Sequence, residues 1–90
     1  MAQGIVVDPA ALEELNRKFV SEAETIRHVT ATIAGQLENT RWEGHTADSF
    51  RSAWAETYRP GLDALEHALQ DAAADVRNAL QRALASDGQG

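Results

Sequence analysis

The feature that most constrains the fold is an uninterrupted helical repeat in the first half of the chain. Between Pro9 and Thr40 there is no further proline, and glycine occurs once, at Gly35. Asp8 and Pro9 mark a helix start. The aspartate side chain can accept a hydrogen bond from a backbone N–H of the first turn, and the N–H that proline lacks would have no partner at that position. Apolar residues then recur at Leu12, Leu15, Phe19, Ala23, Ile26, Ile33 and Leu37. The pattern predicts one helix over about residues 9–39.

The apolar face of this helix is too wide for a single neighbour. Its large residues at a spacing of seven, as along a coiled-coil seam, are Leu12, Phe19, Ile26 and Ile33. Val20 and Val29 lie on opposite flanks of that seam, so apolar positions occupy close to half of the circumference. The opposite, solvated face carries Glu14, Arg17, Lys18, Ser21, Glu24, Thr25, His28 and Thr32. We therefore expect more than one helix to pack against the apolar face.

A second helix is predicted after Gly44, over about residues 46–85, with His45 or Thr46 near its cap. Its apolar positions are Ala47, Phe50, Trp54, Tyr58, Leu62, Leu65, Leu69, Ala72, Val76, Ala79, Leu80 and Ala83. The small, polar tail 86–90 is expected to fray.

Proline interrupts the second helix within a stretch where apolar residues recur every four positions. A spacing of four, from Phe50 to Leu62, rotates the stripe relative to a 3.6-residue repeat. Pro60 removes one hydrogen bond and crowds the carbonyl of Glu56, which predicts a kink at 60–61. A break into two separate helices is the alternative.

Two helices of this length, joined by a turn at about 40–45, must run antiparallel. The predicted fold is therefore an all-α, two-helix hairpin forming a single domain, and a lone hairpin has no interior. Leu, Ile, Val and Phe number 18 and alanine 17, which is a thin core for ninety residues. In a hairpin, however, alanines let helices approach closely and the larger residues need to cover only one stripe per helix. We expect two chains to share a core as a four-helix bundle.

Charge and hydropathy exclude several classes of partner. The net charge of −6 repels phosphate backbones and anionic lipid, so no nucleic-acid binding is expected. No apolar run reaches the roughly 18–20 residues that a membrane span requires. Residues 1–7 lack the basic segment and long apolar stretch of a cleavable signal peptide, so any secretion is expected to follow another route.

No enzymatic activity, cofactor or metal is predicted. The chain has no cysteine, no glycine-rich phosphate loop and no serine in a nucleophile elbow. His28 and His67 each follow an acidic residue by four positions, which favours surface hydrogen bonds over metal ligation. Asp48 and Ser49 suggest the modified serine of an acyl carrier protein. The unbroken repeat of residues 12–37 argues against that class, whose first helix is short and is followed by a long loop.

The turn contains a W-x-G tripeptide, formed by Trp42, Glu43 and Gly44. Gly44 can supply the backbone freedom of a tight turn, and Trp42 can cover the end of a bundle with its indole N–H in water. Together with the flanking helices, this motif resembles the WXG family of early-secreted-antigen-like small proteins, exported by type VII secretion systems. The residues that carry the resemblance are Ile5, Val6, Val7 and Asp8 before the first helix, Trp42 and Gly44, and Ala47, Phe50 and Trp54 after the turn.

The resemblance implies a secreted protein that acts by protein–protein binding, pairs with a second WXG-type chain and meets a type VII secretion ATPase. In paired members, the tryptophan of one chain lies near a Tyr-x-x-x-Asp/Glu tail on the other, as a composite export signal. Here the acidic residue would be Asp87, but Ala83 stands four positions earlier and the only tyrosine is Tyr58. We therefore expect a heterodimer, whose partner supplies the tail, in preference to a homodimer. The alternative function is a cytosolic adaptor or chaperone that pairs with the helical domain of a larger secreted toxin.

Two groups of residues make up the predicted site. Trp42 and Gly44 form the turn and export motif. The predicted core or dimer interface consists of Leu12, Leu15, Phe19, Ile26, Ile33, Leu37, Phe50, Trp54, Leu62, Leu65, Leu69 and Val76. Within it, Phe50 and Trp54 lie nearest the turn, where they either pack in the core or stay exposed as a contact for the secretion ATPase.

Overall fold

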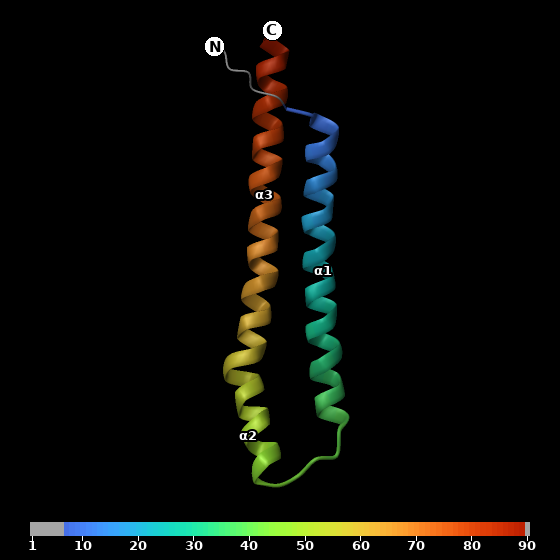
Figure 1. Ribbon diagram of the computed structural model, residues 1–90, viewed down its shortest axis with the longest axis vertical. Coiled ribbons are helices and arrows are strands. Elements are labelled where there is room, and N and C mark those ends of the chain that lie inside the picture. The colour runs from blue at the N-terminus through green and yellow to red at the C-terminus, as the bar shows by residue number, and fades with distance from the viewer. Residues whose placement is uncertain (1–6, 90) are drawn as a thin grey trace.

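Two long helical arms lie side by side and are joined at one end by the turn (Figure 1). The computed structural model describes residues 7–89, with side chains described through residue 85, and every element in that part of the chain is helical. The elements are α1 (Pro9–Asn39), α2 (His45–Ala53), the π-helical turn η1 (Trp54–Tyr58) and α3 (Arg59–Gln89). The molecule is elongated, 67 × 21 × 15 Å. The predicted all-α hairpin is confirmed.

Helix α1 begins at the residues that the sequence indicated. The backbone of Asp8 is extended, and its carboxylate accepts a hydrogen bond from the N–H of Ala11 at 3.3 Å. Pro9 occupies the first helical position, where its missing N–H costs no bond. At the other end, Thr40 is extended and its N–H donates to the carbonyl of Leu37 at 3.3 Å. The helix therefore occupies Pro9–Asn39, the range predicted from the repeat.

The turn enters helix α2 through Gly44, whose φ of 115° and ψ of 179° are essentially reserved for glycine. The carbonyl of Gly44 accepts from the N–H of Asp48 at 3.0 Å, which starts the helix at His45. The sequence suggested His45 or Thr46 near the cap, but the cap residue is Gly44, which makes no side-chain hydrogen bond. The conformational freedom expected of Gly44 is thus used at the point where the chain reverses.

Replacing Gly44 with alanine is expected to lower the free energy of unfolding by about 1.5 kcal/mol, because a Cβ atom disfavours this backbone conformation. Gly35→Ala is the matched control. Gly35 lies inside α1 with nothing within 4 Å of an added Cβ, so alanine there should stabilise the helix by about 0.5–1 kcal/mol. Urea denaturation followed by circular dichroism measures both changes. Equal effects of the same sign at the two sites would contradict the assignment.

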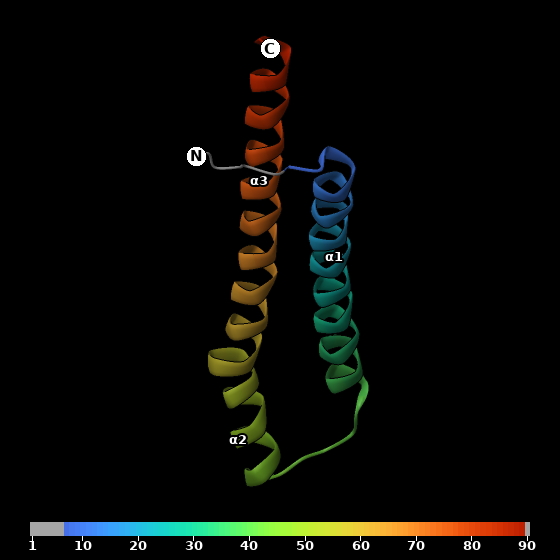
Figure 2. The same ribbon diagram turned by 45° about the horizontal axis from the view of Figure 1, so that its top comes forward.

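The departure from α-helical geometry lies before Pro60 and not at residues 60–61. In η1 the N–H of Arg59 donates to the carbonyl of Trp54, five residues earlier, and the flanking backbone stays helical. The widened turn is visible in Figure 2, and the arm does not break into two helices. Glu56, whose carbonyl Pro60 would crowd in a regular helix, lies inside this wide turn. The expected distortion is present, but the chain accommodates it in the preceding turn.

The wide turn also keeps the residues that recur every four positions on one side of the arm. A regular helix would rotate that stripe by about 40° at each step. The i→i+5 bond of η1 adds a residue to the turn and compensates for the drift. Phe50 and Tyr58 consequently lie near each other, with ring centroids 6.2 Å apart.

Helix α3 continues through Gln89, beyond the end expected at residue 85. The segment 86–89 contains no proline, and one glycine costs a helix only about 1 kcal/mol. Each residue added to an existing helix gains a hydrogen bond, so a long helix extends through such a segment. The helical backbone therefore extends four residues beyond the predicted end, and Gly90 lies outside the described residues.

The two arms meet along small side chains. Ala23 is 2% exposed, Thr30 4% and Ala73 5%, and Ala47 near the turn is fully buried. On α1 these contacts follow a row at a spacing of seven: Asn16, Ala23, Thr30 and Leu37. The predicted seam of Leu12, Phe19, Ile26 and Ile33 lies beside this row and not at its centre. Small side chains at the contact let the helices pack closely, which places the large ones at the edge of the contact.

Two polar side chains within the contact have their hydrogen bonds satisfied. The Asn16 amide donates to the carbonyl of Ala73 across the helix pair at 2.7 Å, and the Thr30 hydroxyl donates to the carbonyl of Ile26 at 2.8 Å. A one-turn shift between the arms would leave the Asn16 amide without that acceptor. The Asn16 bond, which crosses the pair, therefore favours a single register of α1 against α3, whereas the Thr30 bond lies within α1 and satisfies only its buried hydroxyl.

Candidate protein-binding interface

Arg51 holds the W-x-G turn against the end of α1. One guanidinium nitrogen donates to the carbonyl of Trp42 at 2.7 Å, and the other donates to the carbonyls of Thr40 at 3.1 Å and Leu37 at 3.3 Å. The last carbonyls of a helix lack partners within it and carry a partial negative charge. Since α1 has no basic residue in its own last turn, the cation comes from α2.

Sequence reasoning missed Arg51. Its signal lay in two features taken together: a helix end without a cation of its own, and an arginine in the last turn of the next helix. Neither feature has a fixed spacing, because the turn conformation decides which α2 residue reaches the end of α1. The planar guanidinium group suits this role, since its several N–H groups point toward different carbonyls at once.

An aromatic row begins at the turn and continues along the second arm. The ring centroids of Trp42 and Phe50 are 5.8 Å apart, and those of Phe50 and Tyr58 are 6.2 Å apart. The Arg51 guanidinium carbon lies 6.0 Å from the centre of the Trp42 ring. Trp42 is 39% exposed, Phe50 38% and Tyr58 51%. Trp42 therefore lies at the water-exposed edge, as expected, and the row is a surface feature of the single hairpin.

The remaining side chains divide the hairpin into two unlike faces. Successive residues are rotated by about 100° around the helix axis. Around the axis of α1, Leu15 and Ile33 therefore lie about 80° from Ala23 on one side, and Val20 lies about 60° from it on the other. On α3, Leu65 stands about 80° from Ala73 in the same rotational sense as Leu15 from Ala23. Because the helices are antiparallel, positions displaced in the same sense fall on the same face of the pair.

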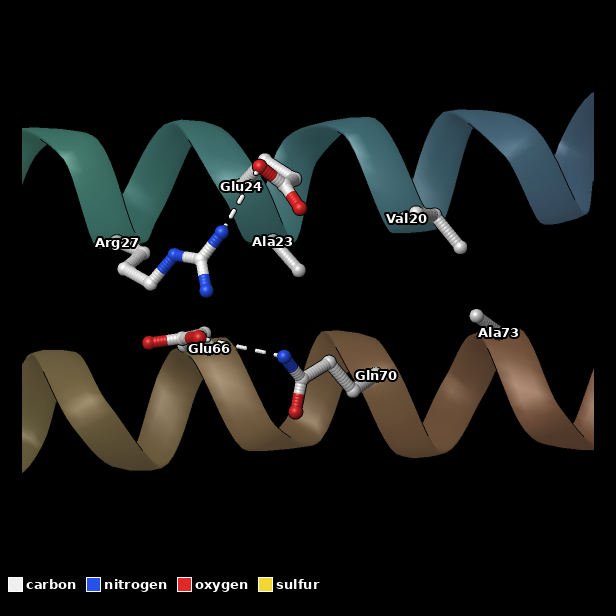
Figure 3. A pocket seen from close by; sticks show the side chains of 7 residues that line it. All are labelled: Val20, Ala23, Glu24, Arg27, Glu66, Gln70 and Ala73. Carbon is white, nitrogen blue, oxygen red and sulfur yellow. Dashed lines mark hydrogen bonds and ion pairs between the residues drawn. The ribbon is translucent and has the colours of Figure 1, made fainter.

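One of these faces, which we call the polar face, is lined by charged and amide side chains. Figure 3 shows a groove on it, bounded by Val20, Ala23, Glu24, Arg27, Glu66, Gln70 and Ala73. Arg27 pairs with Glu24 at 3.0 Å, and the Gln70 amide donates to Glu66 at 3.2 Å. A second groove on this face is lined by Glu13, Asn16, Arg17, Arg77, Leu80, Gln81 and Leu84. In the first groove the charged and amide side chains are thus hydrogen-bonded to one another at the surface.

A solvated ion pair lies farther round α1, next to the polar face. The hydrogen bond from Arg17, at 2.9 Å, lowers the pKa of Glu14 below its usual value, and Glu14 in turn raises the pKa of Arg17. Both side chains are about two-thirds exposed, so solvent screens the pair. The side of α1 predicted to be solvated is indeed occupied by exposed, paired charges.

The opposite face, which we call the apolar face, exposes large hydrophobic side chains on both arms. Its residues are Leu15, Phe19, Ile26, Val29 and Ile33 on α1, and Leu65, Leu69, Ala72, Val76 and Ala79 on α3. Leu15, Val29, Ile33 and Leu65 are each 42–45% exposed. Phe50 and Tyr58 extend this surface toward the turn. A largely hydrophobic surface that extends along both arms is typical of a protein interface.

The structure brings the predicted interface residues together along one long surface. Half-buried beside the contact between the arms are Leu12, Phe19, Ile26, Leu37, Trp54, Leu62, Leu69 and Val76, and exposed are Leu15, Ile33, Phe50 and Leu65. Phe50 is thus no core residue of the single hairpin, whereas Trp54 packs beside Ala34 and Leu37. Within the described residues no large side chain is fully buried. The single hairpin therefore leaves a large part of its hydrophobic surface in water.

The described part of the chain lacks two kinds of feature. No group of three or more His, Cys, Asp or Glu side chains is placed to hold a metal ion. No helix of the described residues is long and apolar enough to cross a membrane.

Comparison with known proteins gives one match. A model of the WXG100 family, described as proteins of 100 residues with WXG, matches residues 4–87. Neither a curated protein nor a solved structure matches the chain.

Proposed function

Because the chain belongs to the WXG100 family, whose members are associated with type VII secretion, we propose that it is a type VII substrate or the dimer partner of one. In this proposal it acts by protein–protein binding. Its apolar face packs against the hairpin of a second WXG-type chain, and the two hairpins form a four-helix bundle. Members of the family commonly pair with other WXG proteins, so the proposed partner is of a familiar kind.

The concentration of exposed large hydrophobic residues on the apolar face is the observation that supports pairing most strongly. Leu15, Val29, Ile33 and Leu65 are more than two-fifths exposed in the single hairpin, and all four lie on the apolar face. Covering such side chains contributes about 25 cal/mol for each Å² removed from water. On the polar face the exposed large hydrophobic residues are Val20 and Leu84, and charged groups line the same grooves, so a second hairpin would gain less there.

The turn is the proposed contact for the export machinery. Arg51 holds the backbone of Trp42 by a 2.7 Å hydrogen bond, so the exposed indole is presented at a defined position at the end of the hairpin. The chain lacks a tyrosine four residues before Asp87. In the proposal a different chain supplies that part of the signal, and secretion proceeds without a cleavable signal peptide. A secretion ATPase is the proposed reader of the combined signal.

Two valine substitutions on α1 test the pairing. Val29 on the apolar face and Val20 on the polar face are 42% and 44% exposed, so aspartate perturbs the single hairpin equally at both sites. Val29→Asp should weaken the complex with the partner by about 30-fold, because a carboxylate would be buried in the new core. Val20→Asp should leave the affinity within about twofold. The measurement is the amount of a second WXG-type chain recovered with each tagged variant from the source organism.

The outcome that contradicts the pairing is equal recovery with both variants, or recovery of no WXG-type chain with the unmodified protein. Export is tested separately, by comparing strains with and without the secretion ATPase. A substrate should disappear from the medium when the ATPase is absent. An adaptor or chaperone for a larger toxin, the alternative function, should stay inside the cell in both strains while the toxin alone changes location.

A further inference from the structure

Glu22 is a charged residue in the middle of the apolar face, and Lys18, one turn earlier, lies at the edge of that face, about 140° from Ala23 in the same sense. Glu22 is exposed and stands midway between Leu15 and Val29 in a row spaced by seven residues. At about 100° per residue, Glu22 lies about 100° from Ala23, in the same sense as the exposed leucine and valine of that row. The ion pairs of the described chain are Arg17–Glu14, Arg27–Glu24 and Arg41–Glu43, and Glu22 belongs to none of them.

Glu22 also lies near the midpoint of the hairpin. Helix α1 spans Pro9–Asn39, so Glu22 is two residues, or about 3 Å, from its middle. When two copies pair through this face with their turns at opposite ends, the two-fold axis crosses the middle of α1. The two Glu22 side chains then lie within about 6 Å of each other along the helix direction. Two carboxylates so close in a partly dry interface repel each other strongly.

The other symmetric pairing gives Glu22 no partner either. With the turns at the same end, α1 of one copy faces α3 of the other. The groove lining places Ala23 level with Gln70 and Ala73, so Glu22 would face Leu65 and Ala72. A carboxylate buried against leucine and alanine lacks both hydration and a counter-ion. Both symmetric arrangements of two copies therefore place Glu22 in the interface with no cation of the other copy opposite it.

We propose that Glu22 selects the partner: it disfavours a second copy of this chain and favours a different helical hairpin that presents a lysine or arginine opposite it. This inference rests on the proposed pairing function and names the chemistry of the partner. A cation there converts the unfavourable charge into an interfacial ion pair, which gives specificity more than affinity. The net charge of −6 on each chain adds to the repulsion between copies.

Neutralising Glu22 tests the proposal. In sedimentation equilibrium, Glu22→Gln should tighten self-association of the purified protein by about tenfold relative to the unmodified chain, and Glu22→Leu should tighten it further. The matched control is Glu13→Gln, which removes the same charge from the polar face of the same helix. It should leave self-association within about twofold, which separates a local effect from that of net charge.

A charge reversal tests the preference for a cation. Glu22→Lys mixed with the unmodified chain should give mixed dimers in native mass spectrometry, at concentrations where the unmodified chain alone does not dimerise. Failure of both Glu22→Gln and Glu22→Leu to tighten self-association overturns the proposal, as does equal tightening by Glu13→Gln. The proposed pairing is tested separately. It requires that a WXG-type partner is recovered with Val20→Asp and lost with Val29→Asp.

Discussion

Replacing Arg51 with alanine is expected to lower the free energy of unfolding by about 3 kcal/mol. The change removes three charge-assisted hydrogen bonds, to the carbonyls of Leu37, Thr40 and Trp42. Such bonds contribute about 1.5–3 kcal/mol each when shielded, and two of these three lie in exposed positions where water replaces part of the loss. Urea denaturation followed by circular dichroism of the protein measures the change.

Two further arginine substitutions separate the bonding from the charge. Arg51→Lys keeps the positive charge near the end of α1 but cannot reach three carbonyls in one plane, so it should recover less than half of the lost stability. Arg59→Ala removes an exposed arginine that lines the neighbouring groove and makes none of these bonds, and should change stability by less than about 0.5 kcal/mol. If Arg51→Lys were as stable as the unmodified protein, simple attraction to the helix end would account for the role of Arg51.

Enlarging Ala23 to leucine should destabilise the hairpin by about 3 kcal/mol. Ala23 is 2% exposed and lies in the contact between α1 and α3, beside Gln70 and Ala73 (Figure 3). Three added carbon atoms must push the arms apart or adopt strained rotamers. Separation of the arms would also strain the hydrogen bond from Asn16 to the carbonyl of Ala73. Thermal unfolding of the protein, monitored at the helix band, measures the loss.

Ala31→Leu is the control for this substitution, because Ala31 is exposed on the same helix. Alanine and leucine have nearly the same helix propensity, so the control should change stability by less than about 0.5 kcal/mol. A similar loss at both positions would show that the close approach of the arms at Ala23 does not limit side-chain size.

Much of the fold follows from local chemistry and could be predicted. The start of α1 depends on an aspartate and a proline that are adjacent in the sequence, and the chain reversal depends on one glycine. These residues act through their own backbone preferences and nearest neighbours. The expectation of a strained helix near Pro60 was likewise sound, but the position of the distortion was wrong. A proline indicates that the regular hydrogen bonding of a helix must change nearby, whereas the packing of the preceding turn determines which hydrogen bonds change.

Contacts between residues distant in sequence could not be predicted in the same way. The heptad of large residues on α1 indicated a seam, and the structure places the alanine, threonine and asparagine row at its centre. Periodicity locates a hydrophobic stripe on a helix but does not say which edge of it faces a given neighbour. Similarly, Arg51 reaches carbonyls 9–14 residues earlier in the chain, a distance that only the folded turn closes.

The amino-acid sequence thus specified two helices, a turn at Trp42–Gly44 and a hydrophobic surface wider than one neighbour covers, because helix formation and amphipathicity depend on spacing along the chain. It also indicated the WXG-type resemblance that the match to the family confirms. Folding in three dimensions determined how that surface is divided. Antiparallel packing turns small side chains inward and collects most of the large ones of both arms on one face, with Glu22 in its middle. That arrangement depends on how the two helices are rotated relative to each other. The size of the side chains at their contact determines this rotation, and the sequence pattern of one helix alone does not specify it.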